Sequence, residues 1–71
     1  MSPVQVGQWV YFNPNKGIRI YGFPELHRIV VGKVIYINEE HRWFSVEYGK
    51  DTSQRISFNF NDFGMNVRLC D

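Results

Sequence analysis

Residues 30–48 read VVGKVIYINEEHRWFSVEY, and this stretch decides the fold. Two runs rich in β-branched and aromatic residues flank a polar turn at Glu39 and Glu40, which is the pattern of a β-hairpin. The sequence therefore predicts one strand over about Val30–Asn38 and the next over about Arg42–Tyr48, with the rest of the chain arranged around them.

The first run of this hairpin is apolar on both faces. In an unbroken strand successive side chains point to opposite faces. One face would then hold Val34 and Tyr36, and the other Val31, Lys33, Ile35 and Ile37. A strand with one solvated face alternates cleanly, so this one is expected to bend and to serve two packed sheets, with Gly32 as the place for the bend.

The runs around the hairpin give further strands. Alternation places Phe44, Val46 and Tyr48 inward, with Trp43, Ser45 and Glu47 on the opposite face. A first strand is predicted over about Gln8–Phe12, with Val10 and Phe12 inward and Trp9 and Tyr11 facing the other way. Turn residues follow it at 13–17. The connection that ends at Ile29 is too long for an ordinary loop, so we expect a structured excursion across 13–29.

The C-terminal third contains the cleanest alternation in the chain. Gln54–Phe60 is predicted to be a strand with Ile56, Phe58 and Phe60 inward. Residues 61–64 suit one tight 3₁₀ turn, and a last strand is expected over about Asn66–Leu69. The predicted core consists of Val10, Phe12, Val34, Phe44, Val46, Ile56, Phe58, Val67 and Leu69.

Composition limits the class of protein. Seventy-one residues make one domain, residues 1–71, with its core within about 6–69. Cys70 is the single cysteine, so the fold is not a disulfide scaffold. No apolar run approaches the roughly 20 residues that span a bilayer, and the N-terminus lacks the basic and apolar regions of a signal peptide. We therefore expect a cytoplasmic protein with no membrane partner.

The order of these elements resembles that of the SH3-like barrels, which include SH3, Tudor and KOW-type domains. The resemblance rests on GKVIYI at 32–37, WFSVEY at 43–48 and NDFG at 61–64, and it covers about Val6 to Leu69. It implies an all-β fold: a small five-stranded SH3-like barrel with a long structured loop between the first two strands and one 3₁₀ turn before the last. The alternative fold is an OB-like barrel, which usually needs a longer chain and a helix.

Catalytic patterns are absent from the sequence. His27, His41 and Cys70 show no ligand spacing for a metal, and the carboxylates cluster near predicted turns rather than in opposed pairs. Phosphate-binding loops and nucleophile elbows are also missing. We expect no enzyme activity, no cofactor and no metal.

The leading hypothesis is a protein-interaction or regulatory module. SH3-like barrels present a groove between the long loop and the hairpin, and here Tyr21, Phe23 and Trp43 could line it, with Tyr11 nearby. Aromatic anchors carry much of the energy at interfaces. Because the loop holds Glu25 as its single acid, recognition of basic proline-rich peptides is disfavoured. The expected binding residues are Arg19, Tyr21, Phe23, His27, Arg28, Arg42 and Trp43.

Three alternatives remain open. The first is RNA or single-stranded DNA bound by a basic and aromatic face that includes Arg19, Arg28, Lys33, Arg42 and Arg55 with Tyr21, Tyr36 and Trp43. The second is an aromatic cage for a methylated lysine or arginine. The third is a homodimer through an apolar face such as Trp9 with Ile35 or Ile37. A protein partner is favoured because the formal net charge is only +1.

Overall fold

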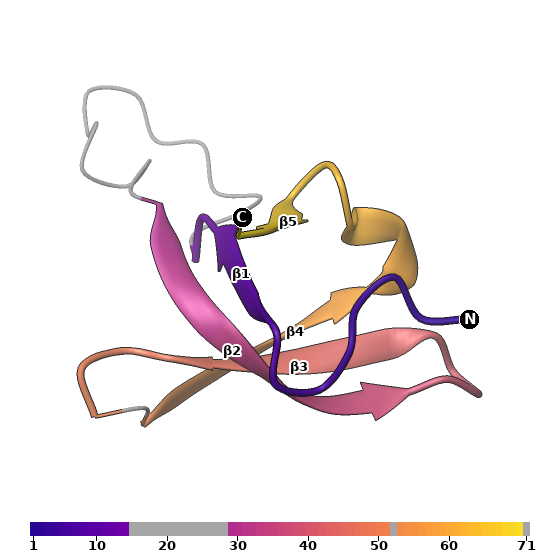
Figure 1. Cartoon of the computed structure of the whole chain (residues 1–71), viewed down its shortest axis with the longest axis horizontal. Coiled ribbons are helices and arrows are strands. Elements are labelled where there is room, and N and C mark those ends of the chain that lie inside the picture. The colour runs from indigo at the N-terminus through magenta and orange to yellow at the C-terminus, as the bar shows by residue number, and fades with distance from the viewer. Residues whose placement is uncertain (15–28, 52, 71) are drawn as a thin grey trace.

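The five strands of the computed structural model form one antiparallel sheet in the order β4-β3-β2-β1-β5 (Figure 1). The structure describes residues 1–14, 29–51 and 53–70. The elements are β1 (Trp9–Phe12), β2 (Val30–Asn38), β3 (Trp43–Tyr48), β4 (Gln54–Asn59), the 3₁₀ turn η2 (Phe60–Asp62) and β5 (Val67–Leu69). The all-β class, the five strands and the 3₁₀ turn before the last strand are confirmed. Among the described residues the sheet has β4 and β5 as its two ends and is not closed by backbone pairing.

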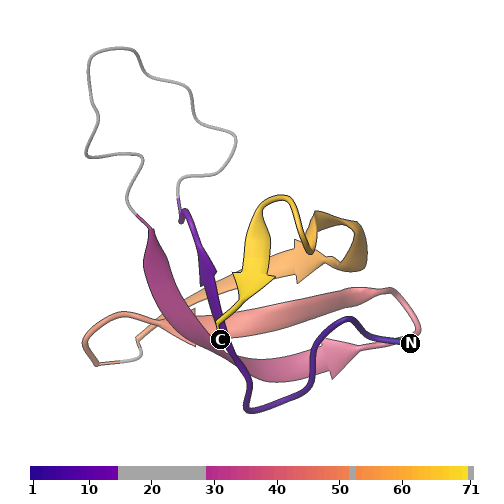
Figure 2. The same ribbon diagram turned by 45° about the horizontal axis from the view of Figure 1, so that its top comes forward.

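Strand β2 is the centre of the sheet and is visibly curved (Figures 1 and 2). Its first residues pair with β1, from Phe12↔Val30 to Trp9↔Lys33, and its length from Gly32 onward pairs with β3. A Cβ at Gly32 would collide with Val46 Cγ1 and lie 2.9 Å from the Glu47 carbonyl oxygen. Glycine is therefore needed where β2 approaches β3 most closely.

A β-bulge interrupts β2. Val34 pairs with Val46, but the next pair is Tyr36 with Ser45, so Ile35 is the extra residue. Because one inserted residue reverses the alternation, Tyr36 points outward and is 51% exposed, while Ile37 packs against the core. The prediction that Tyr36 shares the face of Val34, with Ile37 on the opposite face, is therefore wrong beyond the bulge.

The core lies on the inner side of the curved sheet. Its buried hydrophobic residues are Val4, Val10, Phe12, Val34, Phe44, Val46, Phe58, Phe60 and Val67. Phe12 packs edge-on against both Phe58 and Tyr48, with ring centroids 5.3 Å apart in each pair. Seven of the nine predicted core residues are buried, while Ile56 and Leu69 are half-buried and pack against the cluster.

Val4 is a core residue that the sequence pattern did not predict. The Ser2 hydroxyl donates to the Val4 carbonyl oxygen at 2.7 Å and accepts from the Val4 N–H at 3.1 Å. Farther along, the Gly7 N–H donates to the Val34 carbonyl oxygen at 2.8 Å. These bonds hold the lead-in against β2, so that Val4 is 2% exposed.

Removing the Phe58 ring tests the core. Phe58→Ala should lower the free energy of unfolding by about 3–5 kcal/mol, which is a large part of the stability of so small a domain. Thermal unfolding followed by circular dichroism would measure it. Val31→Ala, at an exposed strand position, is the control and should change stability by roughly 0.5 kcal/mol or less. Equal losses in the two variants would contradict the packing described above.

Because of the bulge, we expect substitutions at the neighbouring residues Tyr36 and Ile37 to differ in their effect on stability. Ile37→Ala should cost about 1–3 kcal/mol because it removes packing against the core. Tyr36→Ala should cost about 1 kcal/mol or less, since its ring lies on the outside. Urea unfolding of both variants gives the order of the two losses. A strand without the bulge would reverse that order.

Candidate binding face

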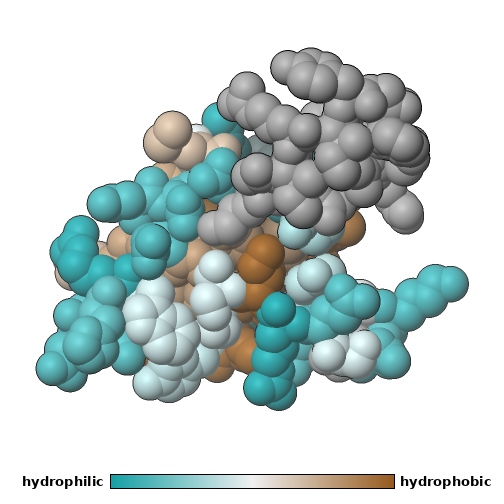
Figure 3. Space-filling view, turned by 180° about the vertical axis from the view of Figure 1, so that it is seen from behind, coloured by the Kyte–Doolittle hydropathy of each residue, from teal (hydrophilic) through white to brown (hydrophobic). Residues whose placement is uncertain are grey.

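The side chains that point away from the core form what we call the outer face of the sheet. Its members are Trp9, Tyr11, Val31, Lys33, Tyr36, Trp43, Ser45, Glu47, Arg55, Ser57, Asn59 and Arg68. Strand register aligns them in rows, one of which runs Trp9–Lys33–Glu47–Arg55 across β1 to β4. Seen from behind the view of Figure 1, the molecule shows pale and brown residues in its lower middle, with hydrophilic residues on both sides of them (Figure 3).

Four residues of this face form an aromatic strip across β1, β2 and β3: Trp9, Lys33, Tyr36 and Trp43. Lys33 Nζ lies 5.9 Å from the centre of the Trp9 ring, a cation–π distance. The Tyr36 and Trp43 rings lie 5.3 Å apart at an angle of 48°. Trp9 is 54% exposed and Trp43 is half-buried. The bulge makes Lys33 and Tyr36 successive outward residues of β2, so the Trp9–Lys33 pair and the Tyr36–Trp43 pair occupy neighbouring positions on the face.

The polar side chains beside the strip bond to one another. The Ser45 and Ser57 hydroxyls share a hydrogen bond of 2.9 Å across β3 and β4. Arg55 and Glu47 form an ion pair at 3.6 Å. These groups are already paired within the sheet, whereas the Trp9 and Tyr36 rings are about half exposed.

Of the seven predicted binding residues, the structure describes two. Trp43 lies in the aromatic strip. Arg42 is exposed in the turn before β3, with a left-handed backbone (φ 63°) and its guanidinium carbon 5.5 Å from the centre of the Phe60 ring. Arg19, Tyr21, Phe23, His27 and Arg28 lie outside the described residues, so their role stays a prediction.

Tyr11 does not join Trp43, contrary to expectation. It pairs with Val31 on one side and Arg68 on the other, whereas Trp43 pairs with Asn38 and Asn59 at the far end of β2. Conversely, the strip contains residues absent from the leading hypothesis. Lys33 and Tyr36 belonged to the nucleic-acid alternative, and Trp9 to the dimer alternative.

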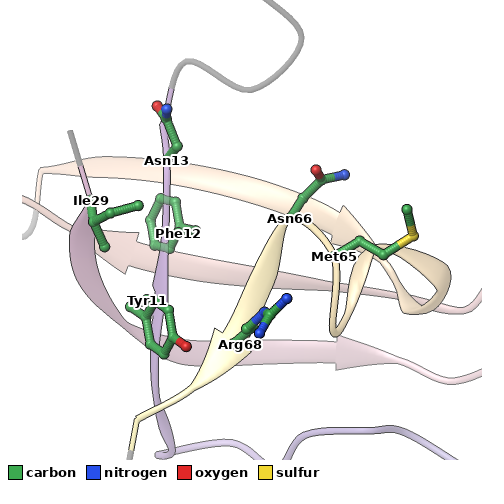
Figure 4. A pocket seen from close by; sticks show the side chains of 7 residues that line it. All are labelled: Tyr11, Phe12, Asn13, Ile29, Met65, Asn66 and Arg68. Atoms are coloured by element: carbon green, nitrogen blue, oxygen red, sulfur yellow. The ribbon is translucent and has the colours of Figure 1, made fainter. Parts of the chain in front are cut away.

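Tyr11 instead lines a cleft of about 320 Å³ at one end of the β1–β5 pair. The cleft is lined by Tyr11, Phe12, Asn13, Ile29, Met65, Asn66 and Arg68. Tyr11 and Arg68 lie side by side on neighbouring strands, and Asn13 and Asn66 lie near the end of the pair (Figure 4). The cleft therefore combines one cationic side chain, Arg68, with neutral polar groups and apolar walls.

Carboxylates of the described residues belong mainly to turns. Ser53 donates hydrogen bonds from its hydroxyl and backbone N–H that lower the pKa of Asp51. Asp62 accepts from the Asn59 N–H at 3.0 Å and from the Asn66 amide at 2.9 Å. On the outer face, the single acid is Glu47. Charge is thus unevenly placed on a chain whose formal net charge is only +1.

Comparison with known proteins gave no relative: no family model, curated protein or solved structure matches the chain. Within residues 1–14, 29–51 and 53–70, no group of three or more histidines, cysteines or carboxylates could hold a metal ion. The same part of the chain contains no helix long and apolar enough to cross a membrane.

The Tyr36–Trp43 contact is testable by a double-mutant cycle. Trp43→Ala alone should leave the domain folded, because the ring packs on the outer face. We expect a coupling energy of about 0.5–1.5 kcal/mol between the two rings, measured by urea unfolding of the wild type, both single variants and the double variant. A coupling of zero would show that the rings do not pack on each other in solution.

Proposed function

We propose that this chain is a non-catalytic binding module of SH3-like architecture whose aromatic strip docks a protein partner. The architecture is supported by the strand order, in which β5 returns to pair with β1, and by η2 immediately before β5. These features agree with what the resemblance in the sequence implies. A cytoplasmic location belongs to the same proposal.

The observation that carries the proposal is the exposure of the strip on the outer face of the hydrogen-bonded sheet. Trp9 and Tyr36 are each about half exposed, and Tyr36 is fixed against Trp43. Aromatic side chains have few rotamers to lose when they are covered, and they are enriched among the residues that contribute most to interfaces. With the neighbouring polar pairs already made, the polar groups that a partner would have to satisfy belong to the strip itself: the two indole N–H groups, the Tyr36 hydroxyl and the Lys33 ammonium.

Single-stranded nucleic acid is the second candidate. The observation in its favour is the placement of Lys33, Arg55 and Arg68 at outward positions, against Glu47 as the one outward acid. Bases would stack on the rings while the cations contact phosphates. The ion pair between Arg55 and Glu47 reduces this positive charge, which places the protein partner first.

A comparative capture experiment tests the proposal. Immobilised wild type, Trp43→Ala and Val6→Ala are exposed to native-host lysate with and without nuclease. Val6 is the control because it is 63% exposed in the lead-in. We expect a protein retained by wild type and Val6→Ala, reduced at least about tenfold by Trp43→Ala, and insensitive to nuclease.

Other results of this experiment point elsewhere. Retention that is unchanged in a folded Trp43→Ala variant would refute the strip as the docking surface. Loss after nuclease treatment, together with oligonucleotide binding that weakens steeply with salt, would establish the nucleic-acid candidate instead. Capture of the same chain, with a mass in solution that doubles with concentration, would identify a second copy as the occupant.

A further inference from the structure

Arg68 is the chemical centre of the cleft at the end of the β1–β5 pair. It is exposed on β5, beside Tyr11, and no carboxylate of the described residues forms an ion pair with it. The nearest parts of the sheet offer no acid to pair with it, since β1, β5 and the first four residues of β2 contain none. Of the described acids, Asp62 adjoins the cleft through its hydrogen bond of 2.9 Å with Asn66, but it forms no ion pair with Arg68. Within the described residues, the Arg68 guanidinium group therefore has no ion-pair partner.

The surroundings of Arg68 define what could bind. The Tyr11 phenol is a neutral hydrogen-bonding group, and so is the Asn66 amide, which already donates one hydrogen bond to Asp62. Ile29 and Met65 supply apolar contact area, being 63% and 79% exposed. Figure 4 shows Ile29 and Met65 on opposite sides of the β1 and β5 side chains. An anion attached to an apolar group matches this combination.

We propose that this cleft binds a carboxylate of the partner protein, with an adjacent apolar side chain resting on Ile29 or Met65. A guanidinium fork matches the planar carboxylate in a bidentate manner. A single arginine among neutral donors suits one negative charge better than a phosphate dianion. The carboxylate comes either from the C-terminus of the partner or from an aspartate or glutamate side chain.

The position of the cleft supports a partner that also covers the aromatic strip, so the inference rests on the proposed function. Tyr11 and Trp9 are successive outward residues of β1, and Val31 and Lys33 are successive outward residues of β2. The cleft and the strip are therefore neighbours on one face. Val31 is 52% exposed between them and continues the apolar surface.

Three small probes test the cleft in the full ¹⁵N-labelled chain, followed by NMR shifts of backbone, asparagine side-chain and arginine Nε–H signals. They are N-acetyl-leucine, the uncharged N-acetyl-leucinamide, and N-acetyl-glutamic acid α-amide. The first carries a terminal carboxylate beside an apolar side chain, and the third carries a side-chain carboxylate. We expect N-acetyl-leucine to bind with a Kd on the order of millimolar and to shift Tyr11, Ile29, Asn66 and Arg68.

The variants separate Arg68 from a general charge effect. Arg68→Gln should weaken N-acetyl-leucine at least about tenfold, the value of one charged hydrogen bond. Lys50→Gln, at an exposed position of the turn after β3, is the control for the loss of one positive charge and should leave the Kd unchanged. Binding by N-acetyl-glutamic acid α-amide equal to or tighter than N-acetyl-leucine would assign the carboxylate to a side chain, and weaker binding to a C-terminus.

Several outcomes would overturn the inference. They are equal shifts with N-acetyl-leucinamide, equal weakening by Lys50→Gln, binding of inorganic phosphate (added as a fourth probe) in place of both carboxylates, and no localised shift with any probe. None of these outcomes would contradict the proposed role of the aromatic strip, because that role is tested separately by the capture experiment with Trp43→Ala. Conversely, N-acetyl-leucine could bind as expected while Trp43→Ala retains the partner protein as well as wild type does. That result would refute the strip as the docking surface and still support the cleft as a carboxylate site.

Discussion

The one-residue bulge in β2 is the constraint on which the surface of this protein depends. A strand presents alternate residues to opposite faces, so one extra residue exchanges the two faces for everything that follows. Ile37 thereby reaches the core and Tyr36 reaches the outer face. Without it, a phenol would replace an aliphatic side chain inside, and Trp43 would lose the ring against which it packs.

Most of the fold could be predicted from local sequence, because the alternation of apolar and polar residues within one strand shows which side chains point inward. In β3 and β4 each inward residue is flanked by polar or amphipathic neighbours, and Phe44, Val46 and Phe58 are buried as the alternation predicts. The predicted strand bounds differ from the observed ones only at the ends. Phe60, predicted as the end of a strand, opens η2 but is still buried.

The parts that were missed depend on contacts between distant residues. Residues 34–37 are all apolar or aromatic, so there is no alternation to show which of them face inward or that one residue is inserted. Only the pairing with β3 determines it. Nothing in the lead-in distinguishes Val4 from Val6, yet Val4 is buried and Val6 is 63% exposed. The burial of Val4 accompanies the bonds that join Gly7 and Gln8 to Val34. The unpredicted bulge made the prediction of the candidate site less accurate than that of the core, because Tyr36 faces the strip only as a result of the bulge.

The outer face also explains why net charge is a poor guide to the partner. Acids in turns and cations on the sheet cancel in the sum, yet they act at different places, because exposed charges are screened beyond about 10 Å at ordinary salt. Glu47 is compensated by Arg55, whereas Arg68 has no acid beside it on β1 or β5. If a protein partner covers the rings near Trp9, as we propose, the positive charge that it would have to match most closely is that of Arg68, at one end of the surface. Aromatic burial would supply the affinity, and the placement of one carboxylate would set the orientation.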